Sequence, residues 1–467
     1  MRDVGMRNHT DTIAAIATAV GSSGIGIVRV SGQEAFAVVS KIFRKGGKQG
    51  CDLGSAENDH RVLYGHIYDE DEMVDEVLVL VMGGPHSYTG EDTVEIDCHG
   101  GVLVIRRILE TVIKYGARPA EPGEFTKRAF LNGRMDLSQA EAVMDLIQAK
   151  NQYALKSSVG QLRGKVSRHI KDLRERILHE TAFIESALDD PEHISLEGYP
   201  LRLKGILESV MDEVRGLLNS ADRGRVMTEG VRTVILGKPN AGKSSLLNVL
   251  VGEERAIVTD IAGTTRDILE EHIRMEGISL NVVDTAGIRE TGDLVEQIGV
   301  SRAKDAAKDA DLIIYVVDGS VPLDENDENI ISMIEGQKAV VLLNKSDLER
   351  TVTVEELRRK TDKRVIEISA KEELGIEELE KTVKDMFYGG EIDFNDQVYI
   401  TNERHKSALT EALRSLKMVM ESIDLGMPED FYSIDLMNAY ECLGSIVGES
   451  VGEDLINEIF GKFCMGK

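Results

Sequence analysis

A nine-residue stretch in the middle of the chain has the composition of a phosphate-binding loop. It reads G-K-P-N-A-G-K-S-S from Gly237 to Ser245, after an apolar run and before apolar residues at helical spacing. Between a strand and a helix, glycines let backbone N–H groups converge on a phosphate, Lys243 supplies a cation, and the Ser244 hydroxyl binds Mg²⁺. The alternative is a glycine-rich turn with a chance Lys-Ser pair. The predicted contacts are Asn240, Ala241, Gly242, Lys243, Ser244 and Ser245.

Two later segments are typical of loops that close over a terminal phosphate. G-T-T-R-D begins at Gly263, and D-T-A-G begins at Asp284 after an apolar strand candidate. A threonine hydroxyl in the first and the acid in the second would lie near Mg²⁺, with a glycine N–H near the terminal phosphate. The predicted contacts here are Thr259, Asp260, Ile261, Ala262, Gly263, Thr264, Thr265, Asp284, Thr285, Ala286 and Gly287.

Two short motifs indicate that the base is guanine. N-K-S-D, from Asn344 through Lys345 to Asp347, follows an apolar strand candidate. A carboxylate there accepts from both the ring N–H and the exocyclic amine of guanine, whereas adenine has its donor and acceptor reversed at that edge. The triplet Ser369, Ala370 and Lys371 would cover the carbonyl of the base. Each motif alone is weak, but in this order they predict GTP binding.

Hydrolysis must be organised differently from that in Ras-like enzymes. The residue after the D-T-A-G motif is Ile288, where those enzymes use a glutamine to orient the attacking water. Asn240 suggests another device, because its side-chain oxygen would hold a monovalent cation beside the β- and γ-phosphates. A loop-shaping hydrogen bond is the alternative role for this side chain.

The composition is that of a multidomain globular protein. The chain has 467 residues, enough for about three domains, and 42% are hydrophobic. No apolar run approaches the ~20 residues of a membrane helix and the N-terminus lacks a secretory signal, so we expect a cytoplasmic protein. The net charge of −27 argues against non-specific coating of nucleic acid. The four cysteines form no C-x-x-C pair, so thiols are expected rather than disulfides.

Strand and helix patterns divide the chain into three parts, which predicts a multidomain α+β and α/β fold. Short strands with two helices run to about residue 120. Strands and helices alternate from 231 to 386, as in a doubly wound parallel sheet, and long helices lie on both sides. The expected domains are an α+β domain at 1–123, a discontinuous helical domain at 124–228 and 390–467, and an inserted G domain at 229–389.

With these motifs assembled, the chain resembles the MnmE/TrmE family of tRNA modification GTPases over nearly its whole length. The nucleotide motifs alone would indicate only a GTPase of the translation-factor class, and the outer motifs make the resemblance specific. These outer motifs are D-T-I-A-A-I-A-T from Asp11, G-I-G-I-V-R-V-S-G from Gly24, P-G-E-F-T-K-R-A-F-L-N-G-R-M-D-L from Pro122, Q-A-E-A-V from Gln139 and F-C-M-G-K from Phe463.

The resemblance implies a homodimer built on the N-terminal domain and an inserted Ras-like G domain. It also implies GTP hydrolysis that K⁺ stimulates when two G domains meet. Carried over to this sequence, Glu296 would position the attacking water and act with Asn240, Lys243 and Asp284. From the residues alone, Glu296 is an ordinary surface carboxylate. The implied ligands are Asn240, Thr259, Ile261 and Thr264 for K⁺, and Ser244 and Thr265 for Mg²⁺.

The resemblance further implies that the N-terminal domain binds a 5-formyltetrahydrofolate-type folate as one-carbon donor. The matching positions are Arg29, Glu95, Arg134 and Lys467. A folate has a pterin with hydrogen-bonding edges and an acidic tail, which a carboxylate and nearby cations suit. Some relatives carry lysine at position 134, and arginine keeps the charge but changes its geometry. Cys464, beside the proposed folate end, is either a reactive thiol or a buried structural one.

The implied reaction installs a carboxymethylaminomethyl-type group at C5 of the wobble uridine, position 34, of certain tRNAs, shared with an FAD-dependent partner protein. No G-x-G-x-x-G fingerprint follows a strand here, so the redox chemistry is expected from that partner. One alternative is a regulatory GTP switch or ribosome-assembly GTPase that binds RNA without modifying it. The other is a folate-dependent aminomethyltransferase whose GTPase is dispensable.

A locally basic helix is predicted between residues 151 and 180. Apolar residues recur there at three- and four-residue steps from Leu155 to Ile177, which is the stripe of a packed helix. Such a helix is either a contact surface for tRNA or an ordinary solvated face, and the sequence leaves both open. Its basic residues are Lys156, Arg163, Lys165, Arg168, Lys171, Arg174 and Arg176.

Overall fold

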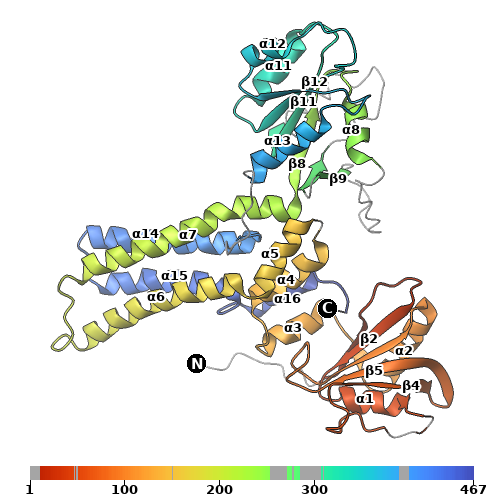
Figure 1. The fold of residues 1–467 in the computed structure, drawn as a ribbon. Coiled ribbons are helices and arrows are strands. Elements are labelled where there is room, and N and C mark those ends of the chain that lie inside the picture. Colours follow the sequence, from red (N-terminus) through yellow and green to blue (C-terminus); the bar gives the residue numbers. More distant parts are fainter. Residues whose placement is uncertain are drawn as a thin grey trace. The chain divides into compact units, whose positions relative to one another are not determined.

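The computed structural model describes residues 11–46, 48, 51–149, 151–252, 271–275, 278–283, 307–308, 310–388 and 399–466. The chain divides into two compact units (Figure 1). Unit 1 comprises residues 1–144, 161–179 and 440–467, and unit 2 comprises residues 145–160 and 180–439. The domain boundaries predicted from the sequence stay a prediction.

A seven-stranded sheet forms the centre of unit 1, in the order β3-β4-β5-β6-β2-β1-β7. All neighbouring strands are antiparallel except β1 and β7, which are parallel. The strands are β1 (Ile13–Ile16), β2 (Ile25–Ser31), β3 (Phe43–Arg44), β4 (Arg61–Asp69), β5 (Glu72–Met82), β6 (Thr93–His99) and β7 (Arg118–Pro119). The four longest follow the alternating runs in the sequence, whereas β1, β3 and β7 are too short to show that periodicity.

Two helices pack on one face of this sheet, α1 (Ala35–Ile42) and α2 (Val102–Lys114). Their apolar residues join the inward side chains of the strands in one buried core. Because strand side chains alternate, every second residue of β2 and β6 points to the other face. That face carries Arg29 and Glu95.

The end of the chain returns to the sheet of unit 1. Helix α3 (Glu124–Leu131) contacts α16 (Glu453–Gly461), and the rings of Phe130 and Phe460 lie 6.1 Å apart. After α16 the chain passes the start of α3, where the N–H of Gly123 donates to the carbonyl of Cys464 at 3.4 Å. Residues near the C-terminus therefore lie beside β1 and β2, far away in the sequence.

The remaining long helices are α4 (Leu137–Gln148), α5 (Gln152–Leu162), α6 (Lys165–Asp189), α7 (Tyr199–Glu229), α14 (Glu403–Asp424) and α15 (Asp430–Val447). In unit 2, α7 packs against α14, so segments on either side of the stretch from β8 to α13 lie together (Figure 1). The sequence suggested one helix at 151–180, and this prediction was wrong. The helix breaks at Gly164, whose φ of 77° lies outside the helical region.

A six-stranded sheet forms the rest of unit 2, in the order β13-β12-β11-β8-β10-β9. The strands are β8 (Val231–Leu236), β9 (Glu271–Met275), β10 (Ile278–Val282), β11 (Leu312–Asp318), β12 (Ala339–Asn344) and β13 (Arg364–Glu367). Residues of α8 (Lys243–Val251) and α13 (Ile376–Tyr388) pack on one face, and residues of α11 (Glu325–Ile334) and α12 (Val354–Lys360) on the other. This arrangement confirms the predicted α/β class.

One strand departs from the predicted parallel sheet, because β9 pairs with β10 in antiparallel fashion. Only two residues separate the two strands, and a parallel crossover needs a dozen or more. All other pairs in the sheet of unit 2 are parallel. Among the described residues, no helix combines the length and apolar character that crossing a membrane requires.

Candidate functional site

The phosphate loop joins β8 to α8, at the carboxyl end of a buried central strand. Its backbone turns through Asn240 with φ of 61° and Gly242 with φ of 101°. A Cβ atom at Gly242 would lie 2.0 Å from Nδ2 of Asn344, so no other residue fits without rearrangement. Helix α8 begins at Lys243, and its first N–H groups form the anion site that a helix N-terminus provides.

Lys243 is held inside this loop by the loop's own backbone. Its ammonium donates to the carbonyls of Gly237 at 2.7 Å and Lys238 at 2.8 Å. Burial lowers the pKa of Lys243, since the charged form loses solvation. A bound phosphate would stabilise the charged ammonium and so compensate for its lost solvation. The geometry therefore favours an anionic ligand.

A second lysine anchors the loop to the neighbouring helix, and sequence reasoning missed it. Lys238 pairs with Asp324 at 3.0 Å and with Asp327 at 2.6 Å, and Asp327 is 1% exposed. The hydroxyl of Tyr315 donates to the same Asp327 at 2.7 Å. Asp324 and Asp327 form a capping box at the start of α11, and that spacing was the available signal.

The N-K-S-D motif lies at the end of β12 and reaches the phosphate loop. Asn344 is 3% exposed, and its Nδ2 donates to the carbonyl of Ala241 at 2.8 Å. Its Oδ1 accepts from the N–H of Ala370 at 3.0 Å. Both polar atoms of the Asn344 side chain thus form hydrogen bonds within the protein. Through them, this residue joins the phosphate loop to the loop after β13.

Asp347 is the exposed carboxylate in this arrangement. The Ser369 hydroxyl donates to its Oδ1 at 2.7 Å, which together with nearby positive charge holds the pKa of Asp347 below its ordinary value. The carboxylate is therefore ionised at neutral pH, as an acceptor for two guanine donors must be. Lys345 adopts φ of 65° and pairs with Asp318 at 2.5 Å, and Lys371 is exposed beside Ser369.

The structure describes only part of the predicted hydrolysis machinery. Ser244 and Ser245 are exposed on the first turn of α8, and Asn240 is exposed in the loop. The positions that would complete the Mg²⁺ and K⁺ sites lie outside the described residues. These are Thr259, Asp260, Ile261, Ala262, Gly263, Thr264, Thr265, Asp284, Thr285, Ala286, Gly287 and Glu296.

In unit 1, a second cluster forms around Arg29 and Glu95, which face each other across β2 and β6. Their side chains pair at 2.7 Å, with 12% and 17% of each side chain exposed. Arg29 also donates from Nη1 to the carbonyl of Gly466 at 3.2 Å. Two predicted positions are thus in contact and the C-terminal segment joins them, while Lys467 lies outside the described residues.

Arg134 reaches the same cluster through an aromatic ring. The guanidinium carbon of Arg134 lies 5.0 Å from the ring centroid of Tyr88, and that of Arg29 lies 5.2 Å from the same centroid. Sequence reasoning missed Tyr88, because an aromatic residue in a loop carries no signal until its neighbours are known. Cys464 is exposed, so the alternative of a buried structural thiol was wrong, and whether the thiol is reactive stays open.

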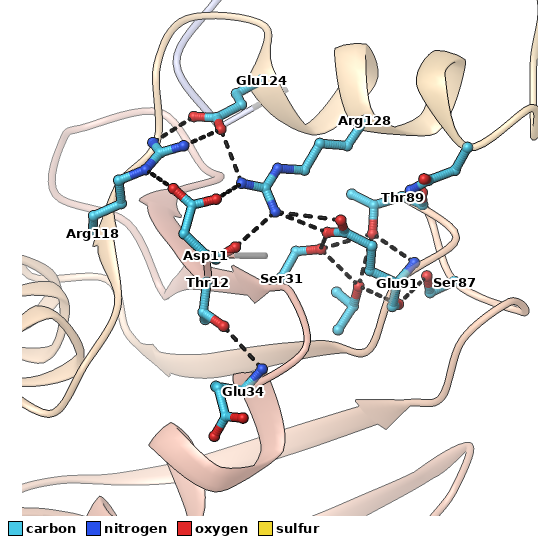
Figure 2. A network of polar contacts seen from close by, with 12 residues as sticks. Asp11, Thr12, Ser31, Glu34, Ser87, Thr89, Glu91, Arg118, Glu124 and Arg128 are labelled. Atoms are coloured by element: carbon cyan, nitrogen blue, oxygen red, sulfur yellow. Dashed lines mark hydrogen bonds and ion pairs between the residues drawn. The ribbon is translucent and has the colours of Figure 1, made fainter. Parts of the chain in front are cut away.

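A buried arginine holds this region together (Figure 2). Arg128 of α3 is 2% exposed, and its guanidinium lies between the carboxylates of Asp11 and Glu124 on one side and Glu91 on the other. It donates to Asp11 Oδ1 at 2.8 Å, and to Glu91 Oε2 and Glu124 Oε1, both at 3.1 Å. Arg118 bonds to Asp11 and Glu124 as well. Three segments that are distant in sequence meet here.

The basic residues predicted between 151 and 180 are not all on the surface. Arg174 is buried at 6% exposure, pairs with Glu449 at 2.5 Å and stacks on the ring of Tyr440 at 4.0 Å. The charge of Arg174 thus serves a contact within unit 1. Arg163, Arg168 and Lys171 are exposed, and whether they contact tRNA stays open.

Comparisons with known proteins cover nearly the whole chain. A family model described as the MnmE helical domain matches residues 137–464, and one described as the GTP-binding protein TrmE N-terminus matches residues 12–134. A tRNA modification GTPase MnmE from Lachnoclostridium phytofermentans is 58% identical over 98% of this chain and 100% of that protein. Proteins of the same name from Geobacillus thermodenitrificans and Alkaliphilus metalliredigens are 47% and 48% identical, each covering 98% of this chain and 99% of their own.

Solved structures match about a third of this chain. The crystal structure of the G domain of the T. maritima FeoB iron transporter covers 33% of this chain and 97% of its own, at 25% identity and a TM-score of 0.26.

Proposed function

Since the chain belongs to the MnmE family of tRNA modification GTPases, we propose that it installs a carboxymethylaminomethyl-type group at C5 of uridine 34 in certain tRNAs, as a homodimer with an FAD-dependent partner protein. Its G domain hydrolyses GTP in this work, and we propose that K⁺ stimulates the hydrolysis. A 5-formyltetrahydrofolate-type folate would supply the one-carbon unit.

The observation that carries the GTP-binding part of this proposal is the double role of Asn344. One side chain bonds to the phosphate loop at Ala241 and to the base loop at Ala370, which fixes the distance between the phosphate and guanine contacts. Asp347, oriented by Ser369, then presents an ionised carboxylate to the guanine edge. A nucleotide bound in this way is selected for its base and held by its phosphates at the same time.

For hydrolysis, Ser244 and Thr265 would hold Mg²⁺, which supplies positive charge to the phosphate oxygens. Asn240 is exposed in the phosphate loop, with φ of 61°, so its side-chain oxygen is open to a ligand. Asn240, with Thr259, Ile261 and Thr264, would hold K⁺ near the terminal phosphates, where negative charge accumulates. Glu296 would position the attacking water, since Ile288 cannot do so.

The K⁺ proposal makes a direct prediction. GTP turnover should be at least about tenfold faster in K⁺ than in Na⁺ at equal ionic strength, because removing one preorganised charge contact costs about 1.4 kcal/mol or more. In Asn240→Ala the difference between the two salts should largely disappear. The matched control is Asn248→Ala, an exposed asparagine of α8, which should keep the preference for K⁺. Equal wild-type rates in both salts would refute the K⁺ site.

For the one-carbon donor, the cluster around Arg29 fits a folate chemically. Glu95 offers a carboxylate to hydrogen-bonding edges of a pterin, and Arg134 and Lys467 offer cations to the acidic tail. In the described part of the chain, Arg134 forms no ion pair, so its charge is available to an anion. A folate bound here would lie against residues of β2, β6 and the C-terminal segment.

The proposed function is tested by analysing wobble uridines in tRNA from cells that lack this protein. The modified uridine should be lost in these cells. The wild-type chain should restore it and Asp284→Ala should not, because the modification is proposed to require GTP hydrolysis. Unchanged uridines in the deletion strain would instead indicate a GTP switch that binds RNA. Full restoration by Asp284→Ala would indicate a modification enzyme that does not need its GTPase.

A further inference from the structure

The two predicted folate cations share one aromatic ring. Arg29 and Arg134 come from β2 and from the segment after α3, and both guanidinium groups lie over Tyr88, with centroid distances of 5.2 and 5.0 Å. Like charges repel, and the electron-rich face of a tyrosine attracts each guanidinium, which offsets part of that repulsion. Arg29 is also held by Glu95 and Gly466, and its guanidinium carbon lies 5.6 Å from the ring centroid of Phe125.

The charges of the pair are only partly neutralised. Glu95 pairs with Arg29, while Arg134 is exposed and has no acidic partner among the described residues. The group of Arg29, Glu95, Arg134 and Tyr88 therefore carries one net positive charge. A ligand with a planar ring and a carboxylate, as a folate has, complements both the ring and this charge.

The loop that carries Tyr88 is held in place by helix α3. The hydroxyl of Tyr88 bonds with that of Thr126 at 2.9 Å, and Nδ2 of Asn132 donates to the carbonyl of Thr89 at 2.8 Å. Arg128 donates to both carboxylate oxygens of Glu91 (Figure 2). Contacts of Tyr88 and of the residues that follow it thus fix the position of its ring.

We propose that Tyr88 is a positioning residue of the folate site, whose ring gathers the guanidinium groups of Arg29 and Arg134 so that an anionic ligand meets both. The proposal rests on the folate function proposed above. Tyr88 acts through the two arginines. The contact between Arg128 and Glu91 stabilises the loop that carries Tyr88. The proposal assigns this role to the ring, while the hydroxyl bonds with that of Thr126.

The test measures the Kd of 5-formyltetrahydrofolate for the full-length chain. Tyr88→Leu should raise Kd about five- to thirtyfold, as the loss of two cation–π contacts predicts. Tyr88→Phe should stay within about threefold of wild type, because it keeps the ring. The matched control is Tyr68→Leu, which removes a similar ring from under Arg44 at 3.8 Å, three strands away from β2.

A double-mutant cycle with Arg134→Gln separates positioning from a general structural effect. If Tyr88 acts through Arg134, the penalty of Tyr88→Leu should shrink at least about threefold in the Arg134→Gln background. The positioning role would be overturned if the effects of the two substitutions on Kd simply add, or if Tyr88→Leu leaves Kd unchanged. Either result would leave the folate site itself standing. Failure of the wild-type chain to bind the folate would overturn both. GTP affinity should be unchanged in every variant, since the site lies in unit 1.

Discussion

Gly242→Ala should weaken GTP binding about 30- to 150-fold. The added Cβ would lie 2.0 Å from Asn344 Nδ2, and the residue would have to hold φ of 101°. Left-handed backbone costs an L-residue about 1–2 kcal/mol, and losing the hydrogen bond from Asn344 to Ala241 adds about 1 kcal/mol. A shift of the loop would also misdirect the N–H groups at the start of α8. The measurement is GTP affinity by calorimetry or a fluorescent analogue.

The control for this variant is Gly216→Ala. Gly216 lies within α7, and nothing lies within 4 Å of the position its Cβ would take. Alanine is the better helix former by about 1 kcal/mol, so this variant should bind GTP normally and be at least as stable as wild type. Normal GTP affinity in Gly242→Ala would mean that the loop closes on nucleotide in a geometry different from the one described.

Arg128→Met should destabilise unit 1 by about 3 kcal/mol at neutral pH. Removing one partner of a buried ion pair leaves the other charge uncompensated, at a cost of about 3–5 kcal/mol. Glu124 is 4% exposed and keeps Arg118, whereas Glu91 and Asp11 remain partly solvated, so the lower end of that range is expected. Denaturant unfolding of the full chain, with hydrogen exchange of the α3 amides to assign the transition, measures the loss.

The loss should depend on pH in a defined direction. Burial alone would raise the pKa of Glu124, but hydrogen bonds from Arg118 and the charges of both arginines outweigh it and hold the pKa below its ordinary value. A carboxylate with a lowered folded-state pKa adds stability above its unfolded value of about 4.3, and that stability is lost as the pH falls through the folded value. The difference between wild type and Arg128→Met should therefore be largest near neutral pH and shrink in acid.

Arg107→Met serves as the matched control. Arg107 also contacts two carboxylates, Asp69 and Glu72, but 47% of its side chain is exposed. Exposed ion pairs contribute about 0–1 kcal/mol, so its removal should be nearly neutral. Equal losses in the two variants would contradict the view that burial makes the Arg128 network important.

Local motifs and strand positions could be predicted because they depend on residues that are close in sequence. The phosphate loop lies between β8 and α8 as its pattern required. The longer strands follow the apolar runs, whereas β1, β3, β7 and β9 gave no such signal. The predictions were wrong where the same local pattern is compatible with more than one structure. Helical periodicity continues across Gly164, although its φ of 77° ends the helix, and a basic pattern cannot distinguish exposed Arg168 from buried Arg174.

The sequence by itself thus determined the nucleotide motifs, the base they select and the class of each fold. Only the tertiary structure decided which side chains meet. Arg29 reaches Glu95 across 66 residues and Gly466 across 437, and Asn344 reaches Ala241 across 103. Such contacts depend on the order of strands in a sheet and on where the chain returns, which no short window encodes. For the same reason Tyr88 became a functional candidate only when two distant arginines were found over its ring.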